Sequence, residues 1–191
     1  MRRSSGLTAW VLGLSASVAV VAASAPTVTF PDRFTGNGTT LVKNGEGMRT
    51  ATIFNVRVYQ AALYLSEKTD DAQKVLASTQ PKRLEMKFMR DVAAADMRKA
   101  WDDNFRENCT QDCEKGLVDL EKIKGWMQDT KSGDVVALDF LANGVKLSVN
   151  GETRGETTEK PAEGKFSNQL LAIWLGKHPP NGALKDGLLG H

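Results

Sequence analysis

The hydrophobic positions along the chain follow two different periods. In some short segments apolar and polar side chains alternate, or β-branched and aromatic residues concentrate, as is typical of β-strands. These segments are residues 27–30, 39–43, 48–54, 56–65, 84–88, 136–140 and 145–149. Segments rich in glycine and asparagine predict turns between them, at residues 36–38, 44–47, 143–144 and 150–151.

Elsewhere, apolar residues spaced three or four positions apart predict helices. Thr69 or Asp70 is expected to cap the first helix and Asp91 the second. Strands that cluster early and again near residue 140, with helices between and after them, predict an α+β fold in which helices cover one face of a largely antiparallel sheet. The expected helices cover residues 70–78, 91–106, 114–128 and 165–175, followed by a short helical turn at 184–189.

The N-terminus has the layout of a secretory signal peptide. Arg2 and Arg3 precede an uncharged, apolar stretch at residues 7–22, and small residues follow it. We therefore expect residues 1–23 to be cleaved off and residues 24–191 to form a single domain. A retained membrane anchor is the alternative, but the stretch is shorter than the roughly 20 apolar residues that a span needs.

Composition and charge exclude several classes of protein. The chain of 191 residues is 41% hydrophobic and 25% charged, which is ordinary globular usage and rules out extensive disorder. Loss of Arg2 and Arg3 with the signal peptide leaves 23 of the 25 basic residues against 23 acidic ones. Nucleic-acid-binding proteins and polybasic membrane-surface proteins carry clustered lysines and arginines, which this neutral chain lacks. We therefore expect no nucleic-acid partner, and no membrane span after cleavage.

Cysteine is scarce, which restricts the possible chemistry. Cys109 and Cys113 are the only cysteines, and in an exported protein such a close pair is most simply a disulfide, here one that pins a turn between two helices. Free or metal-binding thiols and a redox site remain alternatives, although the spacing is wider than in redox pairs.

Histidine is equally scarce, and cofactor motifs are missing. A Ser-His-Asp hydrolase would depend on His178 or His191, the only histidines, and a zinc site would need more ligands than are visible. The sequence contains no P-loop, dinucleotide-binding or calcium-loop motif. We expect neither a cofactor nor a metal.

Three segments share their order and pattern with a known family. The first is Gly-Glu-Gly-Met-Arg at residues 45–49, followed by a tyrosine-containing strand at 56–65. The second is the strand at 84–91, which ends in Arg-Asp, and the third is 166–176 with 184–190 after it. In this order the segments resemble the chalcone isomerase-like family, and they cover most of the chain after the signal peptide.

The resemblance implies one fold and two different functions. The fold is an open-faced β-sandwich, a long sheet with a layer of helices on it. Plant chalcone isomerases close a chalcone into a flavanone by an intramolecular oxa-Michael addition, whereas non-catalytic relatives bind fatty acids in the same cleft, between sheet and helices. Exported bacterial members mostly have no assigned reaction.

The resemblance implies a role for individual residues of this chain that match functional positions of the family. Arg49 matches the arginine that assists the reacting groups in the enzymes and binds the carboxylate in the fatty-acid binders. Tyr59 falls where the plant enzymes have a catalytic threonine and where the binders, like this chain, have tyrosine. Ile173 falls where the enzymes have a Ser or Thr that touches the substrate's phenol, and Met97 and Asn104 fall near their tyrosine and asparagine. The polar set of the enzymes is thus largely absent, and the anion-binding pair is present.

The residues themselves also favour an anion site. Arg49 and Tyr59 are equidistant from Phe54, the middle of the predicted hairpin, and would therefore be cross-strand neighbours. An arginine fork and a phenol are donors suited to the oxygens of a carboxylate. Apolar helix faces, including Met97 and Trp101, would then enclose the rest of the ligand.

Each of these residues also has a purely structural alternative. Arg49 could pair with Glu46 or Asp91 at the surface, and Tyr59 could be a core residue with an internally bonded hydroxyl. Asn104 could cap a neighbouring strand. The remaining candidates could simply be core residues: Met97, Trp101, Ile173 and Trp174.

These residues are compatible with three functions. The leading one is an exported protein, periplasmic or secreted, that binds a small hydrophobic carboxylate such as a fatty acid without turnover. The alternative is an isomerase or lyase acting on an α,β-unsaturated ketone, in which Arg49 stabilises negative charge and Tyr59 or a bound water is the acid/base. The third is a structural or partner-binding envelope protein whose cleft is filled by its own side chains. The expected ligand-binding residues are Arg49, Tyr59, Met97, Trp101, Asn104 and Ile173.

Overall fold

A curled antiparallel sheet forms the centre of the computed structural model, which describes residues 29–52, 54–159 and 165–191. Within these residues the sheet has seven strands, and their order in space is their order along the chain. Such a meander needs only local connections between neighbouring strands. The strands are β1 (Arg33–Gly36), β2 (Thr39–Ala51), β3 (Val56–Leu65), β4 (Lys82–Phe88), β5 (Val135–Leu141), β6 (Gly144–Val149) and β7 (Glu152–Glu156).

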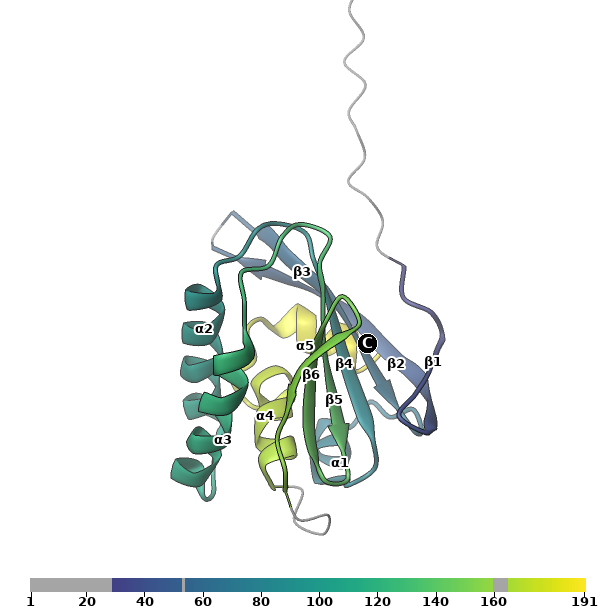
Figure 1. The fold of residues 1–191 in the computed structure, drawn as a ribbon. Helices are drawn as coiled ribbons and strands as arrows, with labels where there is room; N and C mark the ends of the chain where they lie inside the picture. The colour runs from purple at the N-terminus through teal and green to yellow at the C-terminus, as the bar shows by residue number, and fades with distance from the viewer. Residues whose placement is uncertain (1–28, 53, 160–164) are drawn as a thin grey trace, which may run out of the picture.

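Helices cover one face of this sheet (Figure 1). The main core lies between the two layers, where Leu63, Leu84 and Leu138 of the sheet and Leu120 and Leu170 of the helices are fully buried. The α+β architecture, an open-faced β-sandwich, is therefore confirmed. The helices in the described residues are α1 (Ala72–Ala77), α2 (Ala94–Asn108), α3 (Cys113–Trp126), α4 (Lys165–Leu175) and α5 (Gly182–Leu188).

The opposite face of the sheet carries a smaller cluster near its N-terminal edge. Phe30 and Leu41 pack there against Tyr64, with the ring of Phe34 beside them. The guanidinium of Arg83 lies 4.0 Å from the centre of the Phe34 ring and 2.7 Å from a carboxylate oxygen of the buried Asp139. Side chains of β3 therefore alternate between two faces, and this alternation fixes which of them can meet the helices.

The predicted turn at residues 44–47 is wrong, because β2 runs through it as one long strand. A register shift between Lys43 and Gly45 marks a bulge there. Gly45 and Gly47 lie against α5: a Cβ on Gly45 would be 2.2 Å from the carbonyl oxygen of Gly187, and one on Gly47 would be 2.5 Å from that of Leu184. Glycine at these positions permits close backbone approach rather than a turn.

Other element boundaries also differ from the sequence-based expectations. β1 and β7 were not predicted, and residues 29–30 are not part of a strand. Residues 27–28 of that predicted strand and the predicted signal peptide, residues 1–23, lie outside the described residues. Within the described residues, no helix has the length and apolar character to cross a membrane.

The predicted caps of the first two helices are also wrong. Asp71, rather than Thr69 or Asp70, caps α1 by accepting hydrogen bonds from two backbone N–H groups of its first turn. Asp91 does not cap α2, because its carboxylate pairs with Lys131 at 3.0 Å. The N–H of Ala94 instead donates to Asp129, at 2.8 Å.

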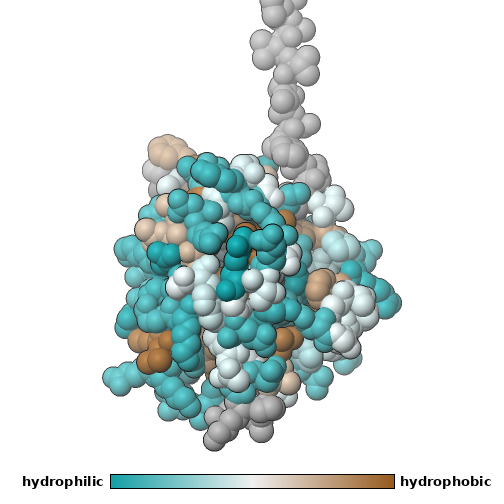
Figure 2. All heavy atoms as spheres, viewed as in Figure 1, coloured by the Kyte–Doolittle hydropathy of each residue, from teal (hydrophilic) through white to brown (hydrophobic). Residues whose placement is uncertain are grey.

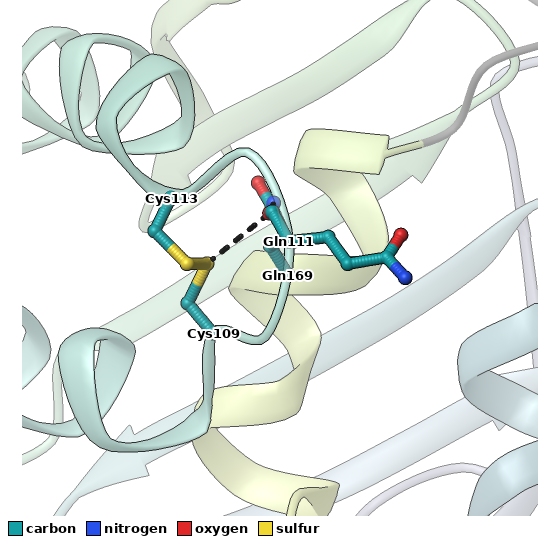
Figure 3. The surroundings of a disulfide bond; sticks show 4 residues. All are labelled: Cys109, Gln111, Cys113 and Gln169. Carbon is teal, nitrogen blue, oxygen red and sulfur yellow. Dashed lines mark hydrogen bonds between the residues drawn. A yellow bond between two sulfur atoms is a disulfide. The ribbon is translucent and has the colours of Figure 1, made fainter.

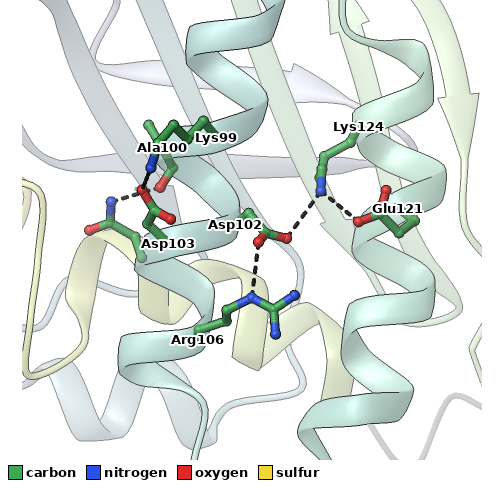
Figure 4. A network of polar contacts seen from close by, with 8 residues as sticks. Lys99, Ala100, Asp102, Asp103, Arg106, Glu121 and Lys124 are labelled. Carbon is green, nitrogen blue, oxygen red and sulfur yellow. Dashed lines mark hydrogen bonds and ion pairs between the residues drawn. The ribbon is translucent and has the colours of Figure 1, made fainter.

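The turn between α2 and α3 is closed by the predicted disulfide, Cys109–Cys113 (Figure 3). The two helices are further joined by a network of charged side chains (Figure 4), in which Lys124 of α3 lies 3.0 Å from Asp102 of α2. Arg98 of α2 also donates to the carbonyl oxygen of Lys124, at 2.8 Å. The disulfide and these polar contacts hold α2 and α3 together.

The close approach of α5 to β2 leads to a stability prediction. We expect Gly45→Ala to lower the free energy of unfolding by about 1–3 kcal/mol, because the added methyl meets rigid backbone. Gly125→Ala is the matched control, since a Cβ at this exposed helical position has nothing within 4 Å. The control should raise stability by about 1 kcal/mol. Urea unfolding of the two variants measures both values, and equal effects would contradict the packing argument.

Candidate functional site

A cleft of about 360 Å³ opens between the sheet and helices α2 and α4, at the end of the sheet where β2 and β3 join. One wall comes from β2, β3 and β4, and the other from α2 and α4. The cleft brings together six residues that the sequence singled out: Arg49, Tyr59, Met97, Trp101, Asn104 and Ile173.

Three side chains form a row across the sheet wall. Arg49 of β2 is the register partner of Tyr59 on β3, and Tyr59 is the partner of Phe88 on β4. Directly opposed residues in an antiparallel pair have side chains on the same face. The Tyr59 and Phe88 rings lie 5.5 Å apart between centroids. Guanidinium, phenol and phenyl groups therefore lie next to one another on the face that the helices cover.

Arg49 brings positive charge to the cleft without an acidic partner among the described residues. Its guanidinium donates to the carbonyl oxygen of Thr50. The two predicted surface partners are engaged elsewhere: Glu46 lies 3.6 Å from Lys43, and Asp91 pairs with Lys131. The alternative of a surface ion pair for Arg49 is therefore wrong.

The hydroxyl of Tyr59 is buried but retains a hydrogen to donate. It accepts a hydrogen bond of 2.9 Å from the indole N–H of Trp174. No acceptor for its own hydrogen is found in the part of the chain that the structure describes. Burial raises the pKa of Tyr59 to about 12, although the bond from Trp174 and the charge of Arg49 both act to lower it. The phenol is therefore protonated at neutral pH, and it combines the predicted core role with a donor at the cleft.

The helix wall is apolar and belongs to the core as well as to the cleft. Met97, Trp101 and Ile173 are 6%, 5% and 1% exposed, and all three are members of the main core cluster. The Trp101 and Trp174 rings meet edge to face, with centroids 5.2 Å apart. Since the two roles coincide, the core alternative for these residues does not exclude contact with a ligand.

Asn104 lies at the edge of the cleft and bonds to its own helix. Its side-chain amide donates to the carbonyl oxygen of Ala100, at 2.7 Å. The expectation that it could cap a neighbouring strand is therefore wrong. The amide oxygen has no partner among the described residues, so it can still accept from a polar group in the cleft.

Some residues of the cleft were not singled out from the sequence. Phe88 completes the cross-sheet row, and its signal was the alternation with Leu84 and Met86. Trp174 lies on a helix face that the sequence leaves open between core and cleft lining, and it is not among the expected ligand-binding residues. Only the structure shows that its indole N–H bonds Tyr59. Pro180, in the connection between α4 and α5, also lines the cleft. Nothing in the sequence pattern indicated that this connection would reach it.

Comparisons with known proteins agree with the fold. A family model described as chalcone isomerase-like matches residues 22–190. Among solved structures, the chain is similar to the crystal structure of a fatty-acid binding protein from Arabidopsis thaliana, with a TM-score of 0.64 and 9% sequence identity. The match covers 84% of this chain and 90% of that one. No curated protein matches the chain.

The raised pKa of Tyr59 predicts how stability depends on pH. Burial favours the neutral phenol, so the pKa in the folded state lies above its ordinary 10.0. The resulting stabilisation is fully present below pH 10 and is lost as the pH rises through about 12. Near-ultraviolet titration of the folded protein should therefore show no tyrosinate at pH 10, because burial also raises the pKa of Tyr64, the only other tyrosine.

Two variants test this assignment. Tyr64→Phe leaves Tyr59 as the only tyrosine, and its titration should be displaced to about 12, whereas the urea-unfolded chain should titrate near 10.0. Between pH 10 and about 12, the Tyr59→Phe protein should lose less stability than the wild type does. A folded Tyr64→Phe protein that titrates at the ordinary pKa would show that Tyr59 is open to water.

Proposed function

The chain belongs to the chalcone isomerase-like family, and we propose that it binds a small hydrophobic carboxylate, such as a fatty acid, without chemical turnover. The observation that carries the proposal is the pairing of Arg49 with Tyr59 in an apolar cleft. The first is a cation without an acidic partner among the described residues, and the second is a protonated phenol with a hydrogen to donate.

Both groups require an acceptor, which points to an anionic headgroup. Arginine presents a planar fork that suits two carboxylate oxygens, and the phenol adds a third donor. A hydrogen bond that involves a charged group contributes about 1.5–3 kcal/mol. An anion at this position would also offset the positive charge of Arg49 in a partly desolvated site.

The apolar wall supports a hydrocarbon tail on that headgroup. Phe88, Met97, Trp101 and Ile173 line the cleft beside the polar pair. Each methylene that they bury contributes about 0.8 kcal/mol. A volume of about 360 Å³ lies within the range of small-molecule sites. This volume also argues against the alternative in which the protein's own side chains fill the cleft, and the similar Arabidopsis protein, described as fatty-acid binding, supports the same ligand class.

Two observations favour binding over catalysis. A phenol whose pKa is raised to about 12 is a poor acid/base at neutral pH, where the best catalytic groups have a pKa near the operating pH. Ile173 puts an apolar side chain where the resemblance places a Ser or Thr of the enzymes. The isomerase alternative would require measurable chalcone consumption above the spontaneous rate that Tyr59→Phe abolishes.

We further propose that the protein acts after export. The charged and apolar layout of residues 1–23 supports a cleaved signal peptide, and the Cys109–Cys113 disulfide is of a kind that persists in oxidising compartments.

Ligand binding provides the direct test. We expect Arg49→Gln to weaken binding of dodecanoate roughly 10–100-fold, because a charged hydrogen-bonding partner is lost. The wild type should bind methyl dodecanoate, which has no charge, more weakly than dodecanoate. The variant should bind this ester with nearly the same affinity as the wild type does. Isothermal titration calorimetry measures both ligands, and native mass spectrometry of the protein purified from cells should show a co-purifying acyl chain.

The matched control is Arg33→Gln, which removes an exposed arginine of β1 that does not line the cleft. It should leave the affinity for dodecanoate unchanged. Full retention of dodecanoate by the Arg49→Gln variant, or equal wild-type affinity for acid and ester, would refute the carboxylate site.

A further inference from the structure

The tip of the β2–β3 hairpin presents an aromatic side chain to solvent. Phe54 is 81% exposed, and only Val118, at 61%, is comparable among large hydrophobic residues in the described part of the chain. Thr52 and Asn55 on either side have positive φ angles of 64° and 52°, which turn the chain so that Phe54 stays at the end of the hairpin. Figure 2 shows brown spheres at this tip, on a side of the molecule that is otherwise mostly hydrophilic.

The tip is directly connected to the cleft. The strands that meet there carry Arg49 and Tyr59, and Ala51, the last residue of β2, lines the cleft. Figure 1 shows this hairpin projecting at the end of the sheet near the start of α2. A surface that contacts the tip would therefore also lie close to the entrance of the cleft.

The charges around the tip are predominantly positive. Arg57 on β3 and Arg90 after β4 are exposed, and neither has an acidic partner among the described residues. Arg49 and Arg90 line the cleft, and Arg57 lies on the hairpin opposite Thr50. Of the two acidic residues that line the cleft, Asp91 is neutralised by Lys131, which leaves Asp96. The local charge is therefore positive, although the chain after the signal peptide is neutral overall.

We propose that the β2–β3 hairpin tip docks on an anionic lipid surface, where the hydrophobic carboxylate enters or leaves the cleft. An exposed aromatic ring and nearby arginines supply the apolar and electrostatic parts of such an interaction. One exposed ring with a few nearby cations is a weak membrane anchor and gives only reversible binding. The contact is therefore transient, as delivery of a ligand requires. The nature of the cargo rests on the proposed function, whereas the docking itself does not.

Vesicle flotation tests the docking without any ligand. The wild-type protein should bind vesicles of phosphatidylcholine mixed with phosphatidylglycerol, and bind pure phosphatidylcholine much less. Phe54→Ser should weaken binding to the mixed vesicles roughly tenfold, from the loss of the buried ring. Arg57→Gln should weaken it about fivefold, the effect expected of one cation near an anionic surface.

Matched controls separate the tip from general surface effects. Val118→Ser removes the other exposed hydrophobic side chain, on α3, and Arg33→Gln removes an exposed arginine of β1. Both should bind vesicles like the wild type. Failure of the wild type to bind mixed vesicles, equal binding to pure phosphatidylcholine, or unchanged binding of Phe54→Ser would overturn the proposal. So would a wild-type dimer in sedimentation experiments that Phe54→Ser dissociates, since the tip would then be a protein interface.

The two proposals fail in different ways. Phe54 and Arg57 do not line the cleft, so their variants should bind dodecanoate with wild-type affinity when no vesicles are present. Transfer of a fluorescent fatty acid from mixed vesicles should then be slower for Phe54→Ser than for Val118→Ser. If the wild type floats with vesicles but binds no dodecanoate, the docking proposal is supported and the proposed carboxylate site is refuted.

Discussion

The register between β2 and β3 is the constraint on which the cleft depends. Side chains alternate between faces along a strand, so a slip of one residue would send every side chain of β2 to the opposite face. In the observed register, Arg49 faces the helices next to Tyr59. The indole N–H of Trp174, on α4, bonds the Tyr59 hydroxyl and so ties this register to the helical layer. The strand register thus brings the charge of Arg49 beside the Tyr59 donor, and the bond from Trp174 connects that donor to the helical layer.

This arrangement shows why local pairing could be predicted from the sequence and tertiary contacts could not. That Arg49 and Tyr59 would meet could be predicted from the hairpin, because a hairpin is closed by its own turn. The exact register depends on a bulge: Ala51 pairs with Val56 and Thr50 with Arg57, and a register shift after Thr50 then brings Arg49 opposite Tyr59. The glycines at 45 and 47 were misread as a turn for the opposite reason. Their meaning depends on α5, which comes about 140 residues later in the chain and packs directly on the backbone there.

Short edge strands and helix caps were missed for related reasons. β1 and β7 contain 4 and 5 residues, too few for an alternating pattern to stand out. The carboxylate that receives the first N–H of α2 belongs to Asp129, beyond α3, so no local sequence pattern could reveal it. The six candidate site residues were selected from the family resemblance and from helical faces. The bond between Trp174 and Tyr59 could not be predicted, because a sequence does not show whether an indole N–H has a hydrogen-bond partner.

Several residues that line the cleft are also part of the main core, and this limits how the cleft can be altered. Trp101, Ile173 and Met97 bury almost all of their surface in the main cluster, so enlarging the cleft through any of them leaves a cavity in the core. The charged residues that line the cleft are not core residues: Arg49, Arg90, Asp91 and Asp96. Charge at the cleft can therefore change at little cost in stability, whereas the volume of the cleft is tied to the packing of α2 and α4. The charge of the cleft is accordingly easier to alter than its volume, because a change of volume disturbs the packed helical layer.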